Sequence, residues 1–177
     1  MKTLKTKFKD MVICQTENFY DHRGYFRELS IEKKIKKKLI FTVMSNSKKN
    51  VLRGMHVQKK NQQGKYVSVI KGKILDVAVD CRKKSKTFGK HFKIILSQKN
   101  CKSIYIPPGF LHGFLALESE NIVIYGCTNY RDKESEIGIK WNDDDLNINW
   151  SISKPIISIK DKKNISFKEY LKQIWEN

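Results

Sequence analysis

The residues best suited to chemistry lie close together in the segment 51–80, VLRGMHVQKKNQQGKYVSVIKGKILDVAVD, which carries Arg53, His56 and Lys65. An imidazole can take up a proton near neutral pH, and two cations can bind a phosphate or stabilise a developing negative charge. This set suits a substrate that carries a phosphate and loses a proton from carbon. Taken alone, His56 fits a structural histidine as well as it fits a base.

A second histidine in a favourable setting is His112, in the sequence IPPGFLHGF. The preceding Pro-Gly turn can form a rigid loop that aims the ring into the mouth of a barrel. The two other histidines, His22 and His91, are expected at the surface. We expect no metal site, because two histidines without a carboxylate make a poor site and the lysines near His56 would repel a divalent cation.

The elements that would position these residues are predominantly β-strands. Residues 66–70 and 73–81 flank Lys71-Gly72, a pattern that predicts a β-hairpin. Alternation along the second strand sends Asp76 to one face and its apolar neighbours to the other. Further short strands separated by turns follow toward the C-terminus, which predicts an antiparallel barrel or sandwich.

Two helices are expected at the ends of this β-rich core. Residues 29–39 place apolar side chains at four-residue spacing, which predicts a short amphipathic helix near the N-terminus. Ser166 and Glu169 form a capping-box pattern that begins a final helix. The apolar stripe of that helix is formed by Phe167, Leu171, Ile174 and Trp175.

Length and composition bound the architecture and the location. We expect one domain spanning residues 1–177, with a barrel core at about 40–150 and a C-terminal helical segment at about 160–177. No apolar run approaches a membrane span and the N-terminus does not resemble a secretory signal, so we expect a cytoplasmic protein without a membrane partner. The four scattered cysteines are expected to be reduced.

The formal charge of +18 does not by itself predict a nucleic-acid partner. Only five of the 36 basic residues are arginine, and lysine is spread over the whole chain rather than gathered in one footprint. The densest run, at residues 33–38, is most simply a solvated helix face. A basic surface should still attract anionic substrates such as nucleotides.

Seven short motifs follow one another along the chain, and their order is more informative than any one of them. They are R-G-x-F-x-E (23–28), N-V-L-R-G-M-H (50–56), Q-G-K (63–65), D-V-A-V-D-x-R (76–82), S-x-T-F-G (85–89), I-P-x-G-F-x-H-G-F (106–114) and W-N-D (141–143). In this order the chain resembles the dTDP-4-dehydrorhamnose 3,5-epimerase family, over roughly residues 10–150.

This resemblance implies an all-β fold with minor helices: a cupin-type jelly-roll β-barrel with a short N-terminal helix and a C-terminal helix. It implies a homodimer whose N-terminal strands exchange across the two-fold axis, with no cofactor and no metal. The implied reaction is epimerisation at C3 of a nucleotide-linked 4-keto sugar through an enolate, in the synthesis of surface polysaccharide sugars. Inversion at C5 as well is an open alternative.

The resemblance also assigns roles in the reaction. His56 matches the base, and Asp161 matches the carboxylate that orients it. Lys65 matches the lysine that stabilises the enolate oxygen, and Tyr125 matches the general acid on the opposite face, its alternative being a core residue of the barrel. Asp76 either orients His56 or Lys65 or makes a buried structural hydrogen bond.

A substrate-binding set carries over in the same way. It combines arginines suited to bidentate contacts with phosphate, aromatic residues that stack on a base, and polar residues that contact the base or the sugar. Its members are Arg23, Arg53 and Glu28 for the diphosphate and sugar, Phe19 and Phe26 for stacking, Asn46 for the base, and His112 for the diphosphate or sugar.

Three departures from the family pattern fall near the expected base pocket. Met44 replaces a glutamine, the loop at 46–50 is shorter, and Arg131 replaces a second aromatic residue after Tyr130. The substrate is therefore either dTDP-4-keto-6-deoxyglucose or a GDP-4-keto-heptose. Two rival functions are a nucleotide-sugar 3,4-ketoisomerase, which should lack a base and an acid on opposite faces, and a metal-dependent or ligand-binding cupin, which should hold iron or manganese.

Overall fold

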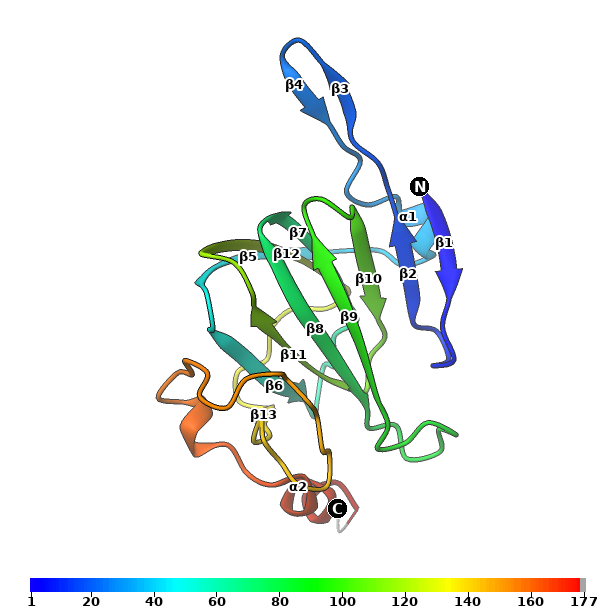
Figure 1. Cartoon of the computed structure of the whole chain (residues 1–177). Coiled ribbons are helices and arrows are strands. Elements are labelled where there is room, and N and C mark those ends of the chain that lie inside the picture. Colours follow the sequence, from blue (N-terminus) through cyan, green and yellow to red (C-terminus); the bar gives the residue numbers. More distant parts are fainter. Residues whose placement is uncertain (176–177) are drawn as a thin grey trace.

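Two β-sheets packed face to face make up most of the chain in the computed structural model, which describes residues 1–175 (Figure 1). The six-stranded sheet has the order β1 (Lys2–Lys5), β2 (Val12–Gln15), β10 (Lys102–Ile106), β7 (Lys65–Lys71), β12 (Glu120–Cys127) and β5 (Phe41–Lys48). The five-stranded sheet has the order β13 (Glu136–Gly138), β6 (Leu52–Gln58), β11 (Phe110–Ala116), β8 (Lys73–Asp80) and β9 (His91–Ser97). The predicted cupin-type, mostly β fold is confirmed.

Of the three hydrophobic clusters among the described residues, two pack against the five-stranded sheet, one on each face. The first lies between the sheets and includes Ala78 of β8 and Phe114 of β11. The second lies on the outer face of the five-stranded sheet, where Val77 and Val79 meet apolar residues of the C-terminal segment. Because both faces of β8 are covered, almost every residue of this strand is buried. The alternation predicted for β8 is confirmed. Asp76 lies on the same face of the strand as Ala78, which points between the sheets, and it is buried there.

The predicted β-hairpin at Lys71-Gly72 is wrong. Strand β7 pairs with β10 and β12, whereas β8 pairs with β9 and β11, so this connection carries the chain from one sheet to the other. Alternation and a glycine turn reveal two consecutive strands but not their partners. Both faces of β8 are buried, so the strands that pair with it were decided by packing between residues far apart in the sequence.

The two predicted helices differ in outcome. Helix α1 is limited to Glu32–Ile35 and ends where Lys36 takes a left-handed conformation, because Ile35 is its one buried residue and a run of lysines follows. Helix α2 (Phe167–Trp175) is confirmed, and its capping box forms, since the Ser166 amide donates to the Glu169 carboxylate at 2.7 Å. Phe167 and Tyr170 bury its inner face.

Parts of the C-terminal prediction lie outside the described residues, namely residues 176 and 177 and the side chain of Trp175. Within residues 1–175, the structure contains no helix that is long and apolar enough to span a membrane.

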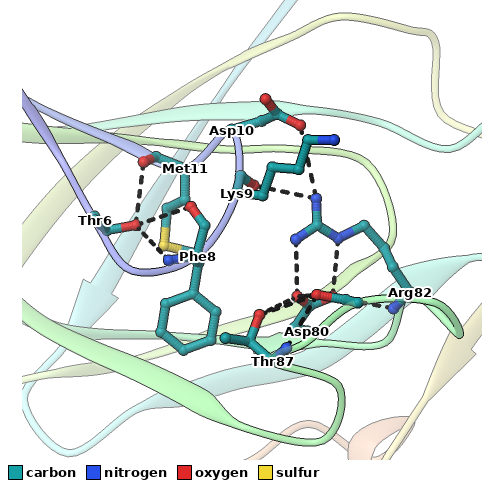
Figure 2. A network of polar contacts seen from close by, with 9 residues as sticks. Thr6, Phe8, Lys9, Asp10, Met11, Asp80, Arg82 and Thr87 are labelled. Atoms are coloured by element: carbon teal, nitrogen blue, oxygen red, sulfur yellow. Dashed lines mark hydrogen bonds and ion pairs between the residues drawn. The ribbon is translucent and has the colours of Figure 1, made fainter.

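A polar network fastens the N-terminal segment to one end of the two-sheet body (Figure 2). Asp80 is fully buried and accepts hydrogen bonds from Arg82, Ser85 and Thr87. The Arg82 guanidinium also donates to the Lys9 carbonyl at 3.1 Å. The turn that contains Lys9 places Phe8 in the core between the sheets. The N-terminal segment is therefore part of the folded body up to the end of β2.

A projecting hairpin follows this segment (Figure 1). It consists of β3 (Phe19–Asp21) and β4 (Gly24–Phe26), which pair only with each other within the described residues. Arg27 ties its base to the body by donating to the backbone carbonyls of Gln98 and Val69, each at 3.0 Å. The side chains beyond this anchor, including Phe19 and Phe26, are exposed.

The connection between the sheets supplies a stability test. A Cβ at Gly72, where φ is +81°, would collide with the backbone carbonyl of Glu120, whereas a Cβ at Gly89, where φ is +71°, meets open space. Both substitutions by alanine carry backbone strain of about 1–2 kcal/mol. We expect Gly72→Ala to lower the free energy of unfolding by more than about 3 kcal/mol because the clash adds to the strain. Urea unfolding of both variants measures this, and equal losses would contradict the crossover geometry.

Candidate active site

The two sheets enclose a cavity of about 620 Å³. Its walls come from β5, β7 and β12 on one side and from β6 and β11 on the other, with residues 156–161 of the C-terminal segment at the edge. Six of the predicted site residues line it: Arg53, His56, Lys65, His112, Tyr125 and Asp161. The tertiary structure thus brings together six side chains from five separate parts of the chain.

His56 forms a hydrogen-bonded pair with Asp161. The His56 Nε2 lies 2.6 Å from the Asp161 Oδ1. Burial raises the pKa of Asp161, but the hydrogen bond and charge of His56 outweigh that effect and hold this pKa below its ordinary value. An ionised carboxylate can only accept a hydrogen bond, so Nε2 carries the hydrogen and Nδ1 is the nitrogen left for a substrate.

The segment that carries Asp161 is docked on the five-stranded sheet at both of its ends, next to β6 at one end and next to β13 at the other. Ile156 forms a parallel bridge with Val51, next to the start of β6, and Ile165 forms a parallel bridge with Ile139. Between these points, Asp161 begins the short 3-10 helix Asp161–Lys163, and its amide donates to the Ser158 hydroxyl at 3.0 Å. These contacts hold the Asp161 carboxylate beside the His56 ring, which lies 105 positions earlier in the sequence.

A second histidine–carboxylate pair lies on the neighbouring strands. His112 is directly opposite His56 in the register of β11 and β6, and its Nε2 lies 2.8 Å from the Asp76 Oδ2. Both members are buried. Of the two alternatives for Asp76, the structure shows the buried hydrogen bond, and it goes to His112 rather than to His56 or Lys65. The other oxygen, Oδ1, is buried and has no hydrogen-bond partner among the described residues.

Lys65 enters the cavity from β7 and is half-buried. Burial lowers the pKa of its ammonium group, and the neighbouring Cys127, Glu136 and Asp76 offset only part of that effect. Within residues 1–175 the ammonium makes no hydrogen bond or ion pair, so it is available to an oxygen of a bound ligand.

Tyr125 lies on β12, in the sheet opposite His56. Burial raises the pKa of its phenol well above the ordinary value, so the hydroxyl is a proton donor at neutral pH. Its ring packs edge-on against His112, with the ring centroids 6.2 Å apart. Its hydroxyl lies 3.0 Å from the hydroxyl oxygen of Ser45. The structure therefore places a potential base and a potential acid on opposite walls of one cavity.

The predicted binding residues fall into two groups. Arg53 lies at the cavity and donates to the Ser47 hydroxyl at 2.9 Å. Asn46 does not line the cavity, and its side chain donates to Glu120 at 3.3 Å. The structure leaves the remaining four on or next to the projecting hairpin, exposed and away from this chain's own cavity: Phe19, Arg23, Phe26 and Glu28.

Sequence reasoning missed an ionic cluster at the cavity edge. Glu136 accepts two hydrogen bonds from Arg131, at 3.0 and 3.2 Å, and a further one from Lys160. Burial raises the pKa of Glu136, but these two cations lower it to about 2. Two signals could have drawn attention to the cluster: Arg131 departs from the family pattern, and Lys160 directly precedes Asp161. Nothing in the local sequence marks Glu136.

In the part of the chain that the structure describes, no three histidine, cysteine, aspartate or glutamate side chains are grouped so that they could hold a metal ion. The two histidines of the cavity each direct Nε2 to a carboxylate rather than toward each other.

Comparison with known proteins identifies the relatives of this fold and site. A family model described as dTDP-4-dehydrorhamnose 3,5-epimerase matches residues 5–169. The enzyme of that name from Salmonella typhimurium is 42% identical over 91% of this chain and 92% of its own length. The enzyme from Methanothermobacter thermautotrophicus is 41% identical over 90% of both.

Two solved structures show the same architecture. The epimerase from Elizabethkingia anophelis superimposes with a TM-score of 0.88 at 42% identity, over 96% of this chain and 97% of that chain. The Legionella pneumophila enzyme, solved in complex with dTDP-4-keto-L-rhamnose, gives 0.89 at 35% identity, over 94% and 93%.

The fold and the cavity define a cupin-type sugar epimerase, an isomerase. More particularly, the chain belongs to the dTDP-4-dehydrorhamnose 3,5-epimerase family, as the order of its motifs indicated.

The ionic cluster predicts how stability responds to acid. The pKa of Glu136 lies near 2 in the folded chain against an ordinary value of 4.5, so its contribution is complete above about pH 4.5 and is lost as the pH falls toward 2. We expect the difference in unfolding free energy between the wild type and Glu136→Gln to be constant at neutral pH and to shrink through that window. Denaturant unfolding at a series of pH values measures it. Glu134→Gln, at an exposed position, serves as the control: its difference in unfolding free energy from the wild type should not shrink between pH 4.5 and 2.

Proposed function

We propose that this epimerase acts on a dTDP-linked 4-keto-6-deoxy sugar, inverting C3 and, as a second centre, C5. The observation that carries the proposal is the placement of the His56–Asp161 pair and Tyr125 on opposite walls of one cavity, with Lys65 beside them. The names of the relatives and the ligand in the Legionella structure support the choice of nucleotide and sugar.

Deprotonation is the first step. His56 Nδ1 removes the proton from the carbon beside the ketone, and the electrons of that C–H bond form a C=C bond while the ketone oxygen becomes an enolate. The Asp161 carboxylate stabilises the imidazolium that results and keeps the ring in one tautomer.

Lys65 stabilises the enolate. Its ammonium is half-buried and makes no hydrogen bond within residues 1–175, so a ketone oxygen that gains negative charge supplies the missing partner. Removing one donor of this kind typically raises a barrier by about 2.7–4 kcal/mol.

Inversion requires that the proton return from the other side of the ring. Tyr125 lies in the opposite sheet, so its O–H can donate to the face of the enolate that His56 does not reach. The enolate collapses to the ketone with a new C–H bond of opposite configuration, and Tyr125 is left as a phenolate.

We further propose that the active enzyme is a homodimer in which the projecting hairpin lies over the cavity of the second copy. The hairpin exposes Phe19 and Phe26, at 52% and 67%, together with Arg23, and none of them reaches its own cavity. Such exposed aromatic and cationic side chains suit a base and a diphosphate bound at the partner's cavity mouth. Because β2 pairs with β1 and β10 of the same chain, we assign the exchange to the hairpin alone.

Isotope exchange tests the chemistry. In D₂O with dTDP-4-keto-6-deoxyglucose we expect deuterium at C3 and C5, and we expect His56→Ala to slow its incorporation by about 10²–10⁴-fold because the base is gone. Tyr125→Phe should keep exchange while losing net inversion. NMR of the recovered sugar reads both. A His56→Ala variant that exchanges at the wild-type rate would show that another group is the base. If the wild type exchanged deuterium only into a GDP-linked 4-keto-heptose, that sugar would replace the dTDP-linked sugar as the proposed substrate.

Mixing two variants with different defects tests the shared site. Arg23→Ala should raise KM because its hairpin no longer holds the diphosphate, and His56→Ala should abolish turnover. If the hairpin serves the other copy, a mixed dimer has one site with both defects and one site with neither, so mixing at low substrate concentration should restore activity. Size-exclusion chromatography confirms the dimer. Activity that stays at the sum of the separate variants would contradict the exchange.

A further inference from the structure

The hydroxyl of Tyr125 has one hydrogen-bond partner within residues 1–175, the hydroxyl of Ser45 at 3.0 Å. The register of β12 and β5 explains the contact. Tyr125 lies opposite Val43, and Ser45 is two residues further along β5, on the same face as Val43. Diagonal neighbours of this kind are within reach of a long aromatic side chain. Both side chains line the cavity.

The proposed reaction requires a group that can return a proton to Tyr125, and the hydrogen bond to Ser45 suits this role. Each inversion leaves Tyr125 as a phenolate inside a partly desolvated cavity, next to the apolar ring of Phe114. A buried anion of this kind needs a hydrogen-bond donor, and the enzyme is ready for another turnover only when the phenolate regains a proton. The two imidazoles are each bonded to a carboxylate, so neither is free to serve through Nε2.

Ser45 has the properties needed to donate a proton to the Tyr125 phenolate. A hydroxyl can donate and accept at the same time, so it can pass one proton on while it receives another. Ser45 is half-buried on β5, which is an edge strand of its sheet, and it lines the cavity. It therefore touches Tyr125 on one side and solvent-accessible space on the other.

Holding β5 in the sheet does not require this hydrogen bond. The two strands are already paired residue by residue from Glu120 opposite Lys48 to Cys127 opposite Phe41. A side-chain hydroxyl pair in the cavity adds little to such a ladder, because its net contribution is only about 1 kcal/mol.

We propose that Ser45 is a positioning residue for Tyr125 and relays the proton that restores its phenol, a role that rests on the proposed function. In the relay the Ser45 O–H bond breaks as its hydrogen passes to the phenolate oxygen, and a solvent water gives Ser45 a proton in the same event. Ser45 is unchanged at the end, the phenol is restored, and the hydroxide formed from that water is neutralised by the proton that His56 releases to solvent.

The test compares two rates measured on the same sample. We expect Ser45→Ala to lower kcat for net inversion about tenfold with KM changed less than twofold, since the proposed role of this hydroxyl is exercised on Tyr125 and not on the substrate. Deuterium exchange from D₂O needs only His56, Asp161 and Lys65, so it should continue near the wild-type rate. The ratio of exchange to inversion should therefore rise about tenfold, and it does not depend on the fraction of protein that is folded.

Two further variants serve as controls. Ser45→Thr keeps a hydroxyl on the same carbon and should restore the wild-type ratio. Thr42→Ala removes an exposed hydroxyl from the same strand, away from the cavity, and should leave both rates unchanged.

Different results would contradict the role of Ser45 and the proposed epimerase function. Ser45→Ala that slows exchange and inversion equally, or slows neither, would overturn the role of Ser45 while the epimerase assignment stands. Wild-type protein that exchanges no deuterium into any nucleotide-linked 4-keto sugar would overturn the proposed function and this relay with it.

Discussion

The hydrogen bond between His56 and Asp161 ties the chemistry of this protein to its architecture. It joins a strand of the five-stranded sheet to the C-terminal segment, across 105 positions of sequence. The segment can supply the carboxylate only because it is docked at Ile156 and Ile165 and packed on the outer core. The second hydrophobic core therefore does more than stabilise the fold, since it helps to fix the orientation of the His56 ring.

Charge balance inside the cavity follows from the same constraint. A buried charge is costly unless a partner lies close, and most charged groups of the cavity have one. His56 faces Asp161, His112 faces Asp76, and Glu136 bridges Arg131 and Lys160. Lys65 and Arg53 are the exceptions among the described residues, because neither forms an ion pair with a carboxylate, so the cavity carries two cations that suit an anionic ligand.

Much of the fold could be predicted because its signals are local. Alternation located the strands, and Ser166 with Glu169 located the start of α2. The partner of each strand could not be read in this way, which is why the hairpin at Gly72 proved to be a crossover. The same limit applies to Asp76, whose inward direction was predicted correctly but whose hydrogen-bond partner was not.

The sequence by itself determined the family and the strand-rich architecture and singled out candidate acid–base residues, because motif order and period-two patterning are properties of the chain read in one dimension. Only the tertiary structure decided which groups meet: Tyr125 with Ser45, Glu136 with its two cations, and the hairpin of Arg23 apart from its own cavity. These contacts join side chains through packing and electrostatics that act over a few ångströms in space, and no local pattern in the chain encodes such distances.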